Sequence, residues 1–123
     1  MIALAALLSV NFTACKGVLG DESIGRTLTG DEIRAELVGN SYRGRLDNGT
    51  AYMEYLHPGG RVRAEGYFGR WTISGDTLCF DYDRGTADDG CWGVALSGNE
   101  ITWLTGGKAD GTATLIAGNP NNL

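Results

Sequence analysis

Residues 67–82 read YFGRWTISGDTLCFDY, and this stretch indicates an antiparallel β-protein. Apolar and polar side chains alternate on both sides of a central Ser-Gly-Asp-Thr at 74–77. A period of two is the pattern of a half-buried β-strand. Glycine as the first central residue suits a type II′ turn, which connects two antiparallel strands. The stretch therefore predicts a hairpin in which Trp71 pairs with Phe80 on the inner face while Cys79 points outward.

The next hairpin places a second cysteine on the same outer face. A turn with the sequence SGNE at 97–100 follows a strand whose inner face carries Trp92 and Val94, so Cys91 points outward. Both cysteines then lie on one face of neighbouring strands, as a disulfide requires. We therefore expect a disulfide between Cys79 and Cys91.

Upstream of this region, an Asn-Gly dipeptide at 48–49 is a strong hairpin signal. Asn-Gly is the preferred sequence of a two-residue type I′ turn. Such a turn pairs Tyr42 with Tyr55 on the inner face and Arg43 with Glu54 on the outer face. The resulting strands are apolar on one side and polar on the other, as a half-buried antiparallel sheet requires.

The turn HPGG at 57–60 sets the register of the following strand. A loop of even length keeps Arg63 on the outer face, where it faces Glu54. Glu54 then stands between two arginines in a charge row across the strands. An outward Tyr52 adds an aromatic side chain to this surface. The expected contact surface consists of Arg43, Tyr52, Glu54 and Arg63.

The body of the chain is a succession of such hairpins. Before them, Thr29 and Glu32 match a capping box, which predicts a short helix over about residues 30–38. Seven or eight antiparallel strands in sequence predict a mainly β meander, closed into a small barrel or left as a bent open sheet with the helix at one end. Large inward side chains fill a small barrel rather than leave a pocket. The inward positions are Tyr42, Met53, Tyr55, Trp71, Phe80, Trp92, Leu96, Ile101 and Trp103.

The N-terminus reads as an export signal. Residues 1–10 are MIALAALLSV, an apolar run too short to span a bilayer. The run leads to Ala14 and Cys15 and resembles the bacterial lipobox, in which a cysteine is lipidated and becomes the new N-terminus. We expect a signal peptide at 1–14, a lipid on Cys15, a flexible tether at 15–28 and one domain at 29–123. The alternative is a buried N-terminal helix with a free Cys15. Three cysteines favour lipidation, because it leaves an even number to pair.

Composition and residue content argue against several functions. The chain has 123 residues and a net charge of −5, so nucleic acid is a poor partner. His57 is the only histidine and lies before Pro58 in a turn, so we expect an exposed loop residue rather than a catalytic base. One histidine and two cysteines that are expected to form a disulfide do not make an ordinary zinc site. The acidic run that begins at Asp81 lacks the spacing of a calcium loop. We expect no cofactor, no metal and no enzymatic activity.

Several segments together carry a family resemblance. They are LTGDEIRAELVGNSYRG at 28–44, YFGRWTISGDTLCFDY at 67–82, GCWGV at 90–94 and GNPNNL at 118–123. With these, the chain resembles a family of small exported bacterial proteins, which implies an exported β-domain and no particular activity. A Gly-x-Trp strand at 69–71 with a cysteine soon after also resembles the small barrel lipoproteins that inhibit bacterial metalloproteases.

Two functions follow as expectations. The first is a non-catalytic binding or structural role in the bacterial envelope, in the periplasm or at the outer membrane, with another envelope component as partner and only the lipid in the membrane. The second is inhibition of metalloproteases, with the segment 16–28 entering the protease cleft.

Overall fold

The computed structural model describes residues 24–83 and 89–123. The predicted signal peptide, Cys15 and most of the tether lie outside the described residues. One helix and nine strands occupy the described ranges. They are β1 (Arg26–Thr27), α3 (Gly30–Leu37), β2 (Ser41–Arg45), β3 (Ala51–His57), β4 (Arg61–Ala64), β5 (Tyr67–Ser74), β6 (Thr77–Tyr82), β7 (Gly90–Ser97), β8 (Glu100–Thr105) and β9 (Lys108–Ile116).

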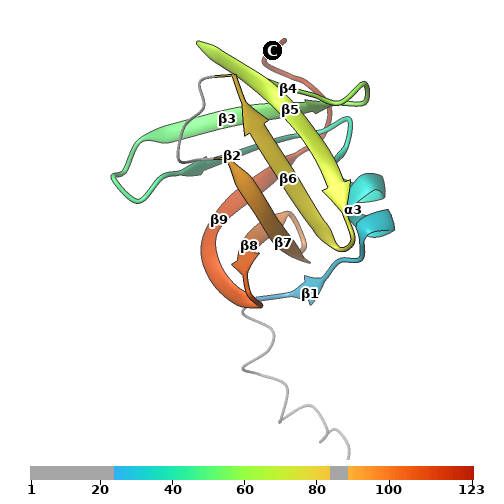
Figure 1. The fold of residues 1–123 in the computed structure, drawn as a ribbon. Helices are drawn as coiled ribbons and strands as arrows, with labels where there is room; N and C mark the ends of the chain where they lie inside the picture. Colours follow the sequence, from blue (N-terminus) through green and yellow to red (C-terminus); the bar gives the residue numbers. More distant parts are fainter. Residues whose placement is uncertain (1–23, 84–88) are drawn as a thin grey trace, which may run out of the picture.

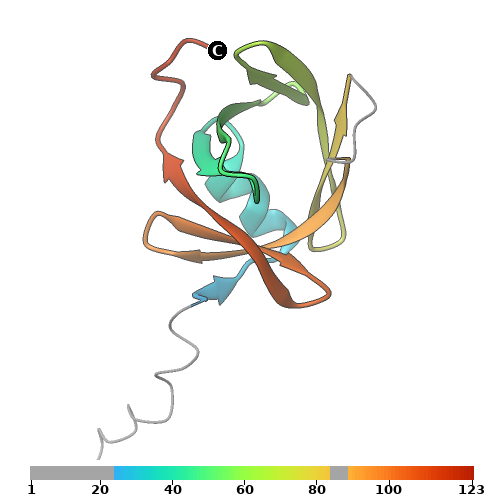
Figure 2. The ribbon, with the colours of Figure 1, turned by 90° about the vertical axis from the view of Figure 1, so that its left-hand side faces the viewer.

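The strands form a closed barrel. Consecutive strands from β2 to β9 are antiparallel neighbours, and β9 returns to pair with β2 (Figure 1). Figure 2 shows the strands as a ring with α3 inside its outline. The two-residue β1 pairs with β7 as an extra strand. The predicted antiparallel meander is confirmed, and the barrel is the closed form of it, in which the eight strands of the ring have no free edge.

The helix α3 covers one end of the barrel. Its capping box is formed as predicted, since the Glu32 amide donates to Thr29 Oγ1 (3.2 Å) and the Thr29 amide donates to Glu32 Oε1 (2.9 Å). The Gly30 amide donates to Asp76 Oδ1 (2.8 Å) in the β5–β6 turn, which ties the helix to that end of the ring. Ile33 and Leu37 of the helix are fully buried.

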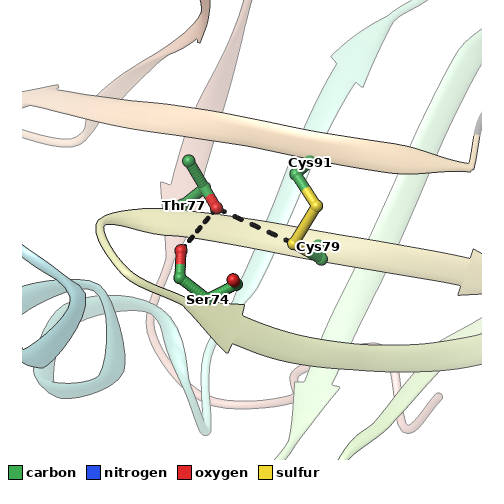
Figure 3. The surroundings of a disulfide bond; sticks show 4 residues. All are labelled: Ser74, Thr77, Cys79 and Cys91. Carbon is green, nitrogen blue, oxygen red and sulfur yellow. Dashed lines mark hydrogen bonds between the residues drawn. A yellow bond between two sulfur atoms is a disulfide. The ribbon is translucent and has the colours of Figure 1, made fainter.

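The hairpins on either side of the disulfide have the predicted registers. Trp71 pairs with Phe80, and Val94 pairs with Trp103. Cys79 lies directly opposite Cys91, and the two sulfurs are bonded (Figure 3). The predicted disulfide is therefore confirmed as a link across β6 and β7.

The predicted register of the β2–β3 hairpin is wrong by one residue. Leu46 and Thr50 close a three-residue loop through a hydrogen bond from the Leu46 amide to the Thr50 carbonyl (2.8 Å). Gly49 adopts a φ of 89° and donates to the Leu46 carbonyl (2.8 Å), which is the pattern of a type I turn followed by a bulge. As a result Tyr42 pairs with Glu54 instead of with Tyr55.

This slip exchanges the two faces of β3, because successive side chains of a strand point to opposite sides. Glu54 is buried inside the barrel, whereas Met53 and Tyr55 lie on the outward-facing positions. The expectation of inward Met53 and Tyr55 is therefore wrong. The predicted Arg43–Glu54–Arg63 row is also absent, because only the two arginines face outward.

The register of the β3–β4 hairpin also differs from the prediction by one residue, and this second difference restores the predicted inward and outward faces of the strands that follow. Its loop has three residues, 58–60, rather than the predicted even number, and Leu56 pairs with Val62 inside the barrel. Because β3 is itself displaced by one residue, Arg63 still faces solvent. Two errors of one residue thus cancel, and the inward positions that were predicted on β5 to β8, from Trp71 to Trp103, do face the interior.

A dry core fills the half of the barrel beside α3. The side chains there are large, aliphatic and fully buried, with relative exposures of 0%. They come from the helix and from five different strands and pack as one cluster. Members of this cluster include Ile33, Leu37, Leu56, Val62, Leu78, Val94 and Ile101.

Candidate functional site

The other half of the barrel holds a cavity. It has a volume of about 600 Å³ and opens at the end opposite α3, between the β2–β3 hairpin and the start of β9. The expectation that large side chains leave no pocket therefore holds only for the helix side. Aromatic rings dominate the inward-facing wall of the cavity: Tyr42, Tyr52, Tyr67, Phe80, Tyr82, Trp92 and Trp103.

Glu54 lies at the inner end of this cavity, next to the dry core. Its side chain projects from β3 and is only 5% exposed. Three tyrosine hydroxyls donate hydrogen bonds to its carboxylate, from Tyr42 (2.5 Å), Tyr67 (2.6 Å) and Tyr82 (2.9 and 3.0 Å). These tyrosines stand on β2, β5 and β6, so the cluster exists only when the barrel is closed. We call Glu54 with these three residues the Glu–Tyr cluster.

The hydrogen bonds of the Glu–Tyr cluster offset the cost of burying the Glu54 carboxylate. Taking an ionised carboxyl group out of water costs several kcal/mol unless hydrogen bonds replace its hydration. Here both oxygens of Glu54 accept bonds from hydroxyl groups, and bonds to a charged acceptor are among the stronger ones in proteins. In return, each tyrosine directs its one hydroxyl hydrogen to Glu54.

The electrostatics of the cluster keep its best-buried hydroxyl protonated. Burial raises the pKa of Tyr42 well above its usual value of 10, and the negative charge of Glu54 raises this pKa further. Burial also raises the pKa of Tyr52, against a hydrogen bond from Trp103 that lowers it. Tyr42 is therefore a stable donor to Glu54 over the whole physiological pH range.

The aromatic rings of the wall support one another through edge and stacked contacts. The Tyr42 and Trp103 rings meet edge to face with centroids 5.2 Å apart. Phe80 stacks on Tyr82 at 5.7 Å and lies 5.9 Å from Trp92. Such contacts stabilise pairs of rings beyond simple burial and hold the wall in one arrangement.

Polar groups also mark the rim. Asp110 at the start of β9 accepts hydrogen bonds from Thr105 Oγ1 (2.7 Å) and from Trp92 Nε1 (3.3 Å). Deeper in the wall, Trp103 Nε1 donates to the Tyr52 hydroxyl (3.3 Å). The cavity thus carries Glu54 at its inner end and Asp110 at its rim, with aromatic surface between them.

Two glycines inside strands make room for these side chains. A Cβ atom at Gly44 would lie 2.6 Å from the Tyr52 hydroxyl oxygen, and one at Gly69 would lie 2.8 Å from the Asp81 carbonyl oxygen and 3.0 Å from Tyr82. Glycine at these positions allows aromatic side chains to lie directly over the neighbouring strand. A glycine inside a strand, opposite an aromatic residue of the neighbouring strand, was the signal in the sequence for the cavity.

The residues predicted as a contact surface do not form one. Arg43 and Arg63 are exposed on the outer face, whereas Glu54 and Tyr52 line the cavity inside the barrel. Tyr67 is likewise inside the barrel, in the Glu–Tyr cluster. The two arginines therefore lie on the opposite side of the barrel wall from the other two residues.

The remaining candidate residues have structural partners. His57 lies at the helix end, where its Nδ1 atom accepts a hydrogen bond from the Gly59 amide (2.8 Å). Asp89, from the predicted acidic loop, accepts a hydrogen bond from the Tyr82 amide (2.8 Å). Within residues 24–83 and 89–123, no group of three or more histidine, cysteine or acidic side chains is arranged to hold a metal ion.

A second depression of similar size, about 610 Å³, lies against the β4–β5 hairpin. Half of its lining residues are exposed, including Arg61, Arg63 and Phe68, and the C-terminal Leu123 contributes to it. Buried polar groups converge in the barrel cavity instead, and convergence of this kind is typical of ligand sites. We therefore regard the barrel cavity as the candidate site.

Comparisons with known proteins found no protein similar to this chain. No family model matches the chain, and neither the curated proteins nor the solved structures include a significant match. In the part of the chain that the structure describes, no helix has the length and apolar character needed to cross a membrane.

Proposed function

We propose that this protein is an exported, lipid-anchored envelope protein whose barrel binds a small molecule without transforming it. The observation that carries the proposal is the cavity of about 600 Å³ that ends at the buried Glu–Tyr cluster. Ligand cavities in proteins typically measure 300–1,000 Å³ and combine apolar walls with a few convergent polar groups.

A purely structural role leaves Glu54 unexplained. An apolar side chain of similar volume would fill its position, and replacing buried charged groups by apolar ones is often neutral or stabilising. Three tyrosines are committed to holding this one carboxylate at the inner end of an open cavity. A ligand-binding role accounts for this arrangement, because the carboxylate lines the cavity and can interact with a bound molecule.

Binding without catalysis agrees with the placement of the titratable groups. His57, the only histidine of the chain, lies at the helix end of the barrel, away from the cavity. The raised pKa of Tyr42 makes this hydroxyl a poor base near neutral pH, because ionisation inside the cluster is disfavoured.

Export is supported by two independent features. The Cys79–Cys91 disulfide fits an oxidising compartment such as the periplasm. The apolar run before Cys15 fits a signal peptide followed by a lipid attachment site. In this proposal the lipid holds the barrel at the membrane, where it meets its ligand.

The inhibitor function remains a prediction with less support. Trp71 of the Gly-x-Trp motif donates from Nε1 to the His57 carbonyl oxygen (2.8 Å), and Gly69 allows close packing on Tyr82. Packing thus accounts for the motif. Arg26–Thr27 pairs with β7 and Leu28 is buried, so a segment that enters a protease must lie before these residues. Titration of secreted metalloproteases with and without residues 16–23 tests this function.

A fluorescent dye tests the small-molecule site. We expect the full chain carrying Cys15→Ser, exported without a lipid, to take up the neutral dye N-phenyl-1-naphthylamine at a single saturable site. Trp92→Leu, at the cavity rim, should weaken this binding. The matched control is Phe68→Leu, because Phe68 is an aromatic residue 54% exposed on the outer depression. Absence of saturable uptake, or weakening by Phe68→Leu alone, would refute the barrel cavity as the site.

A further inference from the structure

We infer that the ligand of the barrel cavity is an organic cation, with an ammonium group at the Glu–Tyr cluster and an apolar body between the aromatic rings. This inference rests on the proposed binding function and names the chemical class of the ligand. Three properties of the cavity lead to it: the hydrogen-bonding capacity of its inner end, the charge of its lining and the nature of its walls.

The inner end of the cavity can accept hydrogen bonds but has little left to donate. An ionised carboxylate only accepts, and a tyrosine hydroxyl has a single hydrogen. Tyr42, Tyr67 and Tyr82 each direct that hydrogen to Glu54, so none of the three hydroxyl groups has a hydrogen left to donate to a ligand. A ligand that meets this surface must therefore bring its own donors. An ammonium group brings up to three.

The charge of the lining favours a cation. The acidic lining residues are Asp47, Glu54 and Asp110, and the basic one is Arg45, which gives a net charge of −2 from three acids and one base. Arg45 also donates from Nη1 to the Gly49 carbonyl oxygen (2.9 Å) and so lies against its own hairpin at the rim. A cleft with charges of one sign and low-dielectric walls concentrates ligands of the opposite sign.

The aromatic walls suit the same kind of ligand. Aromatic faces carry a negative electrostatic potential and attract ammonium groups within about 6 Å of the ring centre, most strongly when water is excluded. Tyrosine and tryptophan rings form much of the cavity wall between Glu54 and Asp110. They also provide apolar surface for the carbon skeleton of the ligand. An anion would meet these faces and the carboxylates of the lining with the wrong sign of charge.

Three probes of similar size and different charge test the inference. They are 2-phenylethylamine, which is a cation at pH 7, the neutral 2-phenylethanol and the anion 3-phenylpropionate. Binding to the Cys15→Ser full chain is measured by calorimetry and by quenching of tryptophan fluorescence. We expect the amine to bind about tenfold more tightly than the alcohol, a difference of about 1.4 kcal/mol, and the anion to bind most weakly.

Variants locate the charge that discriminates between the probes. Glu54→Gln should reduce the preference for the amine over the alcohol to within about twofold, because the ammonium group loses its charged partner. Glu100→Gln removes an exposed carboxylate at the helix end of the barrel and should leave the preference unchanged. Near-UV circular dichroism shows whether each variant is folded. The probe series on the unmodified cavity tests the inference even where Glu54→Gln fails to fold.

The outcomes separate this inference from the proposed function. Equal or tighter binding of the alcohol or the anion would overturn the cationic ligand and leave the binding cavity in place. The same holds if N-phenyl-1-naphthylamine binds and no member of the series does. If neither the dye nor any member binds, the proposed binding function fails together with the inference.

Discussion

The hydroxyl group of Tyr42 gives the sharpest test of the Glu–Tyr cluster. Tyr42 is 1% exposed and donates to Glu54 Oε1 over 2.5 Å, so Tyr42→Phe removes one buried donor with almost no change of shape. A hydrogen bond to a charged group contributes about 1.5–3 kcal/mol to stability. We therefore expect the free energy of unfolding to fall by about 2 kcal/mol. For a domain of about 100 residues this corresponds to a decrease in Tm on the order of 10 °C.

The effect of Tyr42→Phe should depend on pH with a defined sign. The pKa of Tyr42 is raised in the folded state above its usual value of 10. A raised pKa contributes stability that is present below pH 10 and is lost as the pH rises above it, because the unfolded chain then ionises its tyrosine first. Phenylalanine cannot ionise. The stability difference between the two proteins should therefore be constant from pH 7 to 9. It should shrink above pH 10 by about 1.4 kcal/mol per pH unit.

Urea denaturation at several pH values, followed by circular dichroism, measures both effects. The matched control is Tyr55→Phe, because Tyr55 lies on the outward-facing side of the same sheet and is partly exposed. This control should change the free energy of unfolding by less than about 0.5 kcal/mol. If Tyr42→Phe is as stable as the control at pH 7, Glu54 does not depend on this hydroxyl and the reasoning about the cluster is refuted.

Three further predictions concern the helix cap, the disulfide and the anchor. Thr29→Ala should lower the free energy of unfolding by about 1 kcal/mol in thermal unfolding, because it removes the acceptor of the capping box, whereas Thr27→Ala should have little effect. Replacing Cys79 and Cys91 by serine should lower it by about 3 kcal/mol in urea denaturation, since the bond closes a loop with a sequence separation of 12. Equal stability of the oxidised and reduced proteins would contradict this value. Mass spectrometry of the mature protein should find a diacylglycerol-modified Cys15 at the N-terminus, and an unmodified Cys15 in a chain retaining its first residues would exclude the anchor.

Turn residues and the helix cap made much of the fold predictable from the sequence. The two-residue turns at 75–76 and 98–99 allow one register each, so the hairpins they connect follow directly from the alternation of side chains. The capping box at Thr29 similarly defines where the helix begins. From these registers the common outward face of Cys79 and Cys91 follows, and with it the disulfide. None of these features depends on how the barrel closes.

The cavity and its buried carboxylate depend on contacts between strands that are distant in the sequence. An Asn-Gly pair fits a two-residue turn, and it equally fits a three-residue loop with Gly49 in the left-handed conformation that the structure shows. The choice between them moves Glu54 from the outer face to the interior, because one residue of slip exchanges the faces of a strand. Burial of Glu54 is acceptable only where three tyrosines from other strands meet it. That meeting requires the closed ring. Local sequence was therefore enough to predict the β5–β6 and β7–β8 hairpins, the helix and the disulfide, whereas closure of the barrel placed the site on the inner side of β3.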